Sequence, residues 1–186
     1  MNRNLLKSWK LAQWILVFIA SQATAQRYTP IDSVGAIRFT IKNFGVAVEG
    51  TLRGLQGEIF INEADPDKSY FHVQVNARTI DTGINLRNKH LKKEDYLSAE
   101  TFPTIDFRST KIVFAKNESH QVVGLLTLKG ITKQISIAFT STGKQPKVFS
   151  GGFTINRQQF KVGGNSLSMA DEVRIELSVP VRKANE

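Results

Sequence analysis

The segment Val173-Arg174-Ile175-Glu176-Leu177-Ser178-Val179 decides the fold, because its side chains alternate strictly between apolar and polar. A period of two places every second side chain on the same face of an extended strand. One face then meets an apolar interior and the other meets water, as in antiparallel sheets. The segment therefore predicts a half-buried antiparallel strand near the C-terminus.

The same alternation recurs along the chain. The apolar positions are Ile37, Phe39 and Ile41, then Phe71, Val73 and Val75, then Ile135, Ile137 and Phe139, and finally Phe153 and Ile155. Turn residues separate these segments at 43–45, 65–68, 116–118 and 143–146, and we expect residues 54–57 to lead into a separate short strand at 58–61. This pattern predicts an all-β, up-and-down antiparallel barrel of about eight strands, or a sandwich, and a barrel has the advantage of leaving no exposed edge.

Residues 81–103 interrupt the alternation. Ile84, Arg87 and Leu91 recur at helical spacing, Asp81-Thr82 is expected to cap the helix, and Pro103 ends the segment. We therefore predict a helical insertion between central strands, acting as a lid or plug. Its basic residues are Arg87, Lys89, His90, Lys92 and Lys93. They fit either a cationic rim for a phosphate headgroup or an anionic membrane surface, or a plain solvated helix face.

The N-terminus has the layout of a cleaved secretory signal. Basic residues in 1–10 precede a short apolar run at 11–20, and Ala23-Thr24-Ala25 follows. We therefore expect a signal peptide at 1–25, cleavage near Ala25, and a single periplasmic or secreted domain at 26–186. The chain has a formal net charge of +9 and contains no cysteine, which excludes disulfides and thiolate sites. For an exported protein, anionic lipid is a more plausible partner of basic residues than nucleic acid, although the excess charge can also serve solubility alone.

The sequence shows no constellation typical of catalysis or metal binding. His72, His90 and His120 are not at ligand spacing, and the acidic pairs 65/67, 94/95 and 171/172 have the character of solvated turns. No nucleophile, phosphate-loop or dinucleotide motif is present. We therefore expect no catalytic residue, no metal and no cofactor.

The inward apolar positions pose the functional question. An eight-stranded barrel is wide enough either to be filled by side chains or to hold one small ligand. Periodicity does not separate a filled core from a lined lumen, and both readings stay open. If the barrel is hollow, we expect its lining to include Phe39, Phe71, Val73, Phe107, Leu126, Ile137, Phe139, Phe153 and Ile175.

Four segments resemble the YceI family of lipocalin-like bacterial proteins that bind lipids and polyisoprenoids. They are Ala36-Ile37-Arg38-Phe39-Thr40-Ile41-Lys42-Asn43-Phe44-Gly45; Ile80-Asp81-Thr82 with Arg87-Asn88-Lys89-His90-Leu91, Asp95-Tyr96-Leu97 and Phe102-Pro103-Thr104-Ile105; Gly124-Leu125-Leu126-Thr127-Leu128-Lys129-Gly130-Ile131-Thr132-Lys133; and Ile155-Asn156-Arg157-Gln158-Gln159-Phe160 with Asp171-Glu172-Val173. The family often has Arg-Asp where this chain has Arg87-Asn88. The resemblance implies an elongated barrel whose apolar lumen takes a polyisoprenoid chain, without metal or established catalytic residues.

We therefore expect a soluble, non-catalytic carrier of an isoprenoid-type lipid, such as a polyisoprenoid or a quinone-like molecule. We place Arg87 and His90 at the lumen mouth, where they would meet the headgroup. Transient contact with an anionic membrane and a homodimer both stay open. The alternatives are a filled barrel acting as an envelope interaction or stress protein, a membrane-embedded barrel, and an enzyme acting on isoprenoid substrates.

Overall fold

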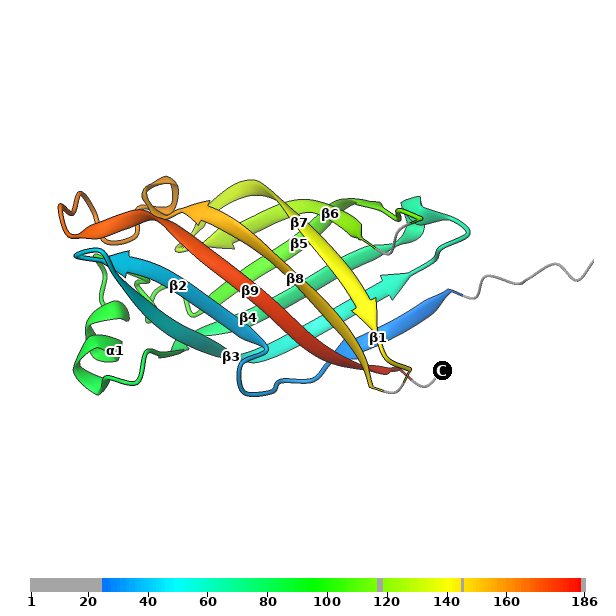
Figure 1. Ribbon diagram of the computed structural model, residues 1–186, viewed down its shortest axis with the longest axis horizontal. Helices are drawn as coiled ribbons and strands as arrows, with labels where there is room; N and C mark the ends of the chain where they lie inside the picture. The colour runs from blue at the N-terminus through cyan, green and yellow to red at the C-terminus, as the bar shows by residue number, and fades with distance from the viewer. Residues whose placement is uncertain (1–24, 117–118, 145, 185–186) are drawn as a thin grey trace, which may run out of the picture.

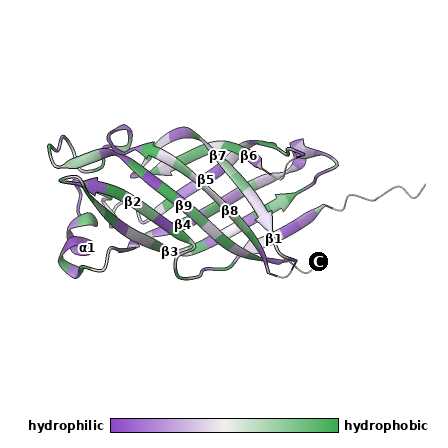
Figure 2. Ribbon diagram, viewed as in Figure 1, coloured by the Kyte–Doolittle hydropathy of each residue, from purple (hydrophilic) through white to green (hydrophobic). Residues whose placement is uncertain are grey.

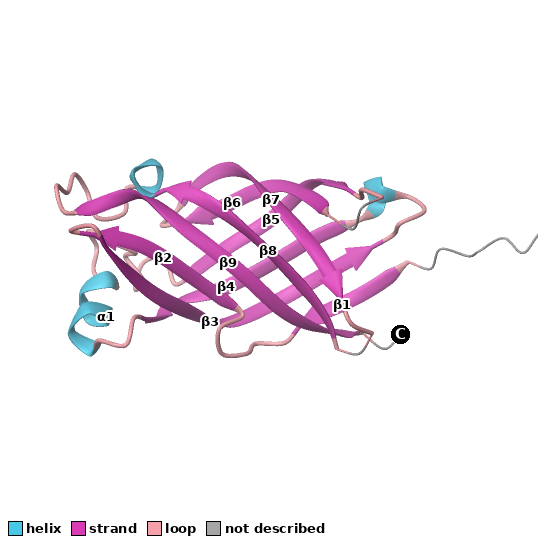
Figure 3. Ribbon diagram, viewed as in Figure 1, coloured by secondary structure: helices cyan, strands magenta, loops and turns pink. Residues whose placement is uncertain are grey.

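The chain forms an elongated antiparallel barrel (Figures 1 and 3). The computed structural model describes residues 25–116, 119–144 and 146–184, so the expected signal at 1–25 and two residues of the predicted turn at 116–118 lie outside it, apart from Ala25. The described strands are β1 (Gln26–Pro30), β2 (Ile37–Asn43), β3 (Val46–Ile61), β4 (Tyr70–Asp81), β5 (Thr104–Val113), β6 (His120–Leu128), β7 (Ile131–Thr142), β8 (Lys147–Asn156) and β9 (Met169–Lys183). The described helices are η1 (Pro66–Lys68), α1 (Asn85–Leu91) and η2 (Arg157–Phe160).

These strands occupy eight positions around the barrel, which confirms the predicted fold. From β3 to β9 each strand pairs with the next one along the chain, always antiparallel. Strand β2 closes the barrel between β3 and β9, and β1 pairs with the same two strands further along. The strands β1 and β2 are thus two halves of one position, separated by residues 31–36.

Strand β3 corrects one expectation. The turn predicted at 54–57 and the separate strand at 58–61 are wrong, because β3 runs unbroken from Val46 to Ile61. The register against β4 instead shifts between Arg53 and Gln56, where Gly54 has φ +76°, while Gly57 has φ +127° and pairs in register with Val73. A Cβ on Gly57 would lie 2.2 Å from the His72 carbonyl oxygen, so the neighbouring strand approaches too closely for any side chain there.

The insertion between β4 and β5 is less helical than its spacing suggested. Helix α1 spans seven residues, and turns occupy most of the chain from there to Pro103. The expected cap is also wrong, because the N-cap position is Ile84, with no side-chain cap bond. Instead, Asp81 Oδ1 accepts hydrogen bonds from the Gly83 backbone N–H (2.9 Å) and from Asn88 Nδ2 (2.8 Å). The Asp81 carboxylate therefore holds the turn that leads into α1, but it does not cap the helix.

The connections divide between the two ends of the barrel. We call one the α1 end; it carries the β2–β3 turn, the insertion and the β8–β9 loop, while η1 and both ends of the described chain lie toward the other, the η1 end (Figure 1). Apolar and polar residues alternate along the strands (Figure 2), as the period-two pattern predicts. Among the described residues, no helix has the length and apolar character needed to cross a bilayer.

Candidate functional site

The barrel encloses an elongated cavity of about 300 Å³, which we call the lumen. This volume lies at the lower end of the range for ligand pockets, roughly 300–1,000 Å³. All nine positions expected from the alternation line it: Phe39, Phe71, Val73, Phe107, Leu126, Ile137, Phe139, Phe153 and Ile175. The structure therefore shows a hollow barrel, and contact between these residues and a ligand stays a prediction.

Two glycines explain how large aromatic side chains leave the lumen open. Gly50 faces Phe39 directly across β3 and β2, and a Cβ on Gly50 would lie 2.3 Å from Phe39 Cζ. In the same way, a Cβ on Gly124 would lie 2.6 Å from Phe107 Cζ. Each ring occupies the space that a neighbouring side chain would otherwise take. The Phe39 and Phe107 rings therefore lie along the wall and do not fill the centre.

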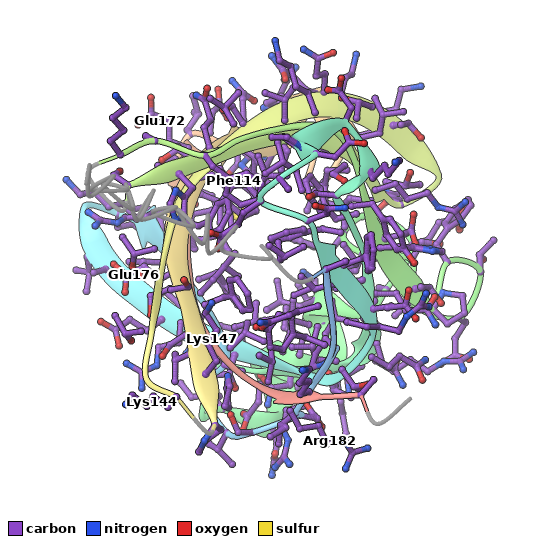
Figure 4. The ribbon with its side chains drawn as sticks, turned by 90° about the vertical axis from the view of Figure 1, so that its right-hand side faces the viewer. Phe114, Lys144, Lys147, Glu172, Glu176 and Arg182 are labelled. Carbon is purple, nitrogen blue, oxygen red and sulfur yellow. The ribbon has the colours of Figure 1, made fainter. Side chains whose placement is uncertain are left out.

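An aromatic cluster fills the barrel toward the η1 end. Phe71, Phe139 and Phe149 lie with ring centroids 5.3–6.0 Å apart, and Tyr28 meets Phe149 at 5.7 Å. Lys147 Nζ lies 5.6 Å from the Tyr28 ring centroid and 5.7 Å from that of Phe149, within cation–π range. Figure 4 looks along the barrel from this end and labels Lys147. Burial in the cluster raises the pKa of the Tyr28 hydroxyl, with a smaller contribution from Glu63.

Polar groups border the lumen at the α1 end, where Arg87 has free donors. Its Nε donates to Thr82 Oγ1 and its Nη2 to the Thr82 carbonyl oxygen, both at 2.8 Å. Thr82 Oγ1 in turn donates to Asn88 Oδ1 at 2.7 Å. Among the described residues, Nη1 has no hydrogen-bond partner, although Arg87 is half-buried and lines the lumen. A positioned guanidinium with spare N–H groups can bind an anionic or carbonyl oxygen.

His90 does not join Arg87 at the lumen. Its ring lies against Tyr96, with centroids 4.6 Å apart, and it borders an outer hollow together with Lys129 and Lys161. His90 is therefore not among the residues that line the lumen, contrary to the expectation; its ring packs on Tyr96, which borders both the lumen and the outer hollow.

The other histidines also lie apart. His72 points outward and contacts Asp106 Oδ2 at 3.2 Å, while His120 Nδ1 accepts from the Ala115 N–H. Within residues 25–116, 119–144 and 146–184, no group of three His, Cys, Asp or Glu side chains could hold a metal ion.

Arg157 is a site residue for which the sequence analysis gave no role. Its side chain is 2% exposed and supports the β8–β9 loop beside the lumen. Nε donates to the carbonyl oxygen of Ala170 (2.9 Å), Nη1 to those of Val162 (2.8 Å) and Gly164 (2.7 Å), and Nη2 to that of Met169 (3.1 Å), while Nη2 also pairs with Asp171 Oδ1 (2.9 Å). These contacts use all five guanidinium N–H groups. Arg157 is therefore committed to holding the loop and differs in this from Arg87.

Comparisons with known proteins agree with this architecture. The YceI-like domain family matches residues 28–181. A UPF0312 protein of Yersinia enterocolitica is 32% identical over 176 residues, covering 88% of this chain and 90% of that one. A UPF0312 protein of Pseudomonas aeruginosa is 31% identical over 180 residues, covering 91% and 93%.

Two solved structures share the fold. BcnA of Burkholderia cenocepacia superposes with a TM-score of 0.72 at 22% identity, over 82% of this chain and 99% of that one. A polyisoprenoid binding domain from Saccharophagus degradans gives a TM-score of 0.61 at 11% identity, over 84% and 98%. The family match covers nearly the whole barrel, and so the chain belongs to the YceI-like domain family.

Proposed function

We propose that this protein is a carrier that holds one isoprenoid-type lipid, a polyisoprenoid or a quinone-like molecule, with its tail in the lumen. The observation that carries the proposal is a lumen of about 300 Å³ whose lining is almost wholly apolar. The structural likeness to a polyisoprenoid binding domain supports the choice of tail.

The energetics favour a long tail. Burial of apolar surface contributes roughly 0.8 kcal/mol per CH₂. Association costs about 4–15 kcal/mol in lost freedom of motion. A tail of about fifteen carbons gains roughly 12 kcal/mol on this basis, so only longer tails bind tightly through burial alone.

The two ends of the lumen differ, and this difference orients the lipid. Aromatic side chains occupy the η1 end, whereas Arg87 and Thr82 border the α1 end. A polar headgroup loses its hydration without compensation among aromatic rings. The tail therefore points toward the aromatic cluster, and the headgroup lies beside the free Nη1 of Arg87.

The proposal includes export. The basic, apolar and small-residue order at 1–25 supports cleavage near Ala25 and action in the periplasm or outside the cell. Intact-mass measurement of protein recovered from the periplasm tests this point. A chain that retains residues 1–25, or that stays in the cytoplasm, contradicts it.

The cargo is tested by native mass spectrometry of protein purified without detergent, followed by solvent extraction. We expect one isoprenoid-type lipid per protein. Incubation with a straight-chain fatty acid of equal carbon number provides the comparison for tail shape. A ligand-free mass that incubation with isoprenoid lipids does not change contradicts the carrier function, and turnover of the lipid would instead indicate an enzyme.

The headgroup position is tested with Arg87→Ala, using His90→Ala as the matched control on the same helix. A charged hydrogen bond contributes about 1.5–3 kcal/mol, so Arg87→Ala is expected to weaken binding of an isoprenyl phosphate by about 10- to 100-fold. Binding of an uncharged isoprenoid hydrocarbon should not change. Equal losses in the two variants, or none in Arg87→Ala, would remove the headgroup role of Arg87.

A further inference from the structure

The largest exposed apolar side chains gather at the α1 end. The described large hydrophobic residues that are more than half exposed are Leu167 (111%), Phe44 (81%), Leu86 (79%), Val34 (77%), Val46 (66%) and Ile84 (52%). All except Val34 belong to the β2–β3 turn, the start of α1 or the β8–β9 loop, which lie together at that end (Figure 1). We call Phe44, Val46, Ile84, Leu86 and Leu167 the apolar ring.

A backbone contact fixes two of the loops that carry the ring. The Phe44 N–H donates to the Ser168 carbonyl oxygen at 2.7 Å, which places the β2–β3 turn against the β8–β9 loop. Arg157 holds the same loop from inside through the carbonyl oxygens of Val162 and Gly164. Phe44 and Leu167 are thus exposed on two loops that a backbone hydrogen bond joins.

Phe44 is an unusual choice for its backbone conformation. Asn43 pairs with Val46, so Phe44 and Gly45 form a two-residue turn with φ values of +49° and +77°. Such hairpin turns favour Asn, Asp or Gly at the first position, because other side chains are strained at positive φ. An exposed phenylalanine there lowers stability and contributes no packing to the core. Phe44 therefore departs from the residue preference of the turn without stabilising the fold, and such a departure points to a role in binding.

Several lysines lie on the segments that carry the ring. The segments 42–48, 84–93 and 158–170 contain the basic residues Lys42, Arg87, Lys89, Lys92, Lys93 and Lys161. The acidic residues that directly follow these segments are Glu49, Glu94, Asp95, Asp171 and Glu172, and Asp171 pairs with the buried Arg157. The α1 end therefore combines exposed apolar side chains with lysines on the same segments.

We propose that the α1 end docks on an anionic lipid bilayer, with the apolar ring inserted at the depth of the headgroups. Burial of the apolar side chains at the interface stabilises the docked state, and the lysines are attracted to anionic headgroups. The docked surface is the one onto which the lumen's polar end opens. The inference goes beyond the proposed carrier function and does not depend on which molecule the lumen holds.

The test measures partitioning onto vesicles of phosphatidylcholine with and without phosphatidylglycerol. The chain has no cysteine, so Leu167→Cys and Val34→Cys each accept one environment-sensitive fluorophore. We expect a blue shift, and quenching by brominated acyl chains, for the label at 167 with anionic vesicles. The label at 34 should stay in water. Raised salt should weaken the partitioning.

Substitutions give the second readout. Phe44→Asn and Leu167→Ser should each weaken partitioning by about tenfold, because each removes one apolar side chain that docking would bury in the bilayer. Val34→Ser, equally exposed but placed between β1 and β2, is the matched control and should bind as wild type. Asn suits the positive φ at position 44, so Phe44→Asn should also unfold at a higher denaturant concentration, which separates lost binding from misfolding.

Three results would overturn the inference. They are equal partitioning of all variants, label shifts at 34 that match those at 167, and no binding to any vesicle. In the last case a second copy of the chain would be the remaining occupant to test, by comparing the sedimentation of wild type and Leu167→Ser.

Discussion

Replacement of Gly50 by alanine should push the Phe39 ring into the lumen. The added Cβ would lie 2.3 Å from Phe39 Cζ and 2.6 Å from Cε1, more than 1 Å inside ordinary contact. The Asp81 carbonyl oxygen, 2.8 Å from the same point, prevents relief on the backbone side. The ring therefore has to move inward. Overpacking of this kind costs about 1–3 kcal/mol.

The magnitude follows from two opposing effects. Alanine restricts the unfolded chain more than glycine does, and this effect alone raises the free energy of unfolding by about 0.4–1 kcal/mol. We therefore expect Gly50→Ala to lose about 1–2 kcal/mol of unfolding free energy, and less lipid should co-purify with it. Phe39→Leu lacks the ring atoms that collide. In the double variant part of the loss should return, while the Asp81 contact keeps the rescue incomplete.

The assay is urea unfolding, monitored by circular dichroism, of the wild type, both single variants and the double variant. Gly152→Ala is the matched control, because a Cβ there meets one atom within 4 Å, the Ile175 carbonyl oxygen at 3.1 Å. We expect it to change stability by less than about 0.5 kcal/mol. If the Gly50 and Phe39 effects add within about 0.5 kcal/mol, the ring does not occupy the glycine's space and the explanation of the open lumen is wrong.

Three further predictions concern polar contacts. Arg157→Met should lose about 3–5 kcal/mol of unfolding free energy, because two carbonyls of the β8–β9 loop and two at the start of β9 lose their donor. Arg157→Lys should recover part of this loss, and equal urea midpoints for wild type and Arg157→Met would contradict the prediction. The pKa of Asp81 is held low by the Gly83 N–H and then by the Asn88 amide, so its stabilising effect is present above pH ~4 and is lost as pH falls through its folded pKa. Asn88→Asp should therefore lower the thermal midpoint at pH 7 and approach wild type near pH ~3, and a difference independent of pH would refute this. The Tyr70 hydroxyl, and then Arg27, hold the pKa of Glu58 low, so Glu58→Gln should cost less than about 1 kcal/mol at pH 7, and this cost should shrink as pH falls through the folded pKa of Glu58; a cost that does not change with pH would exclude this linkage.

Period-two alternation predicted the antiparallel strands and the inward positions, although it left a barrel and a sandwich both open. In strands such as β2 and β9, one face packs inward throughout, so local sequence carries the whole signal. It was insufficient for β1, because Gln26-Arg27-Tyr28-Thr29-Pro30 does not alternate between apolar and polar side chains. That strand is defined by its partners in β3 and β9, which lie far away along the chain.

Other errors arose where one local signal fits two structures. Gly54 and Gly57 are compatible with a turn or with a continuous strand, and only the pairing with β4 decides for the strand. Asp81 has a capping side chain, yet Gly83 and Asn88 use its oxygen atoms. Arg157 could not be assigned a role, because four of its partners are backbone carbonyls, which every residue type offers. Each of these outcomes depends on tertiary contacts.

Whether the barrel is hollow depends on strand register more than on composition. Inward phenylalanines suggest a filled core when their volumes are simply added. Phe39 and Phe107 nevertheless place their ring tips where Gly50 and Gly124 have no side chain, and so they thicken the wall instead of filling the centre. A shift of one residue between β2 and β3 would end the pairing of Phe39 with Gly50 and turn the inward set of one strand outward. The pairing of an inward aromatic residue with an inward glycine on the next strand is therefore the feature by which a lined lumen can be distinguished from a packed core.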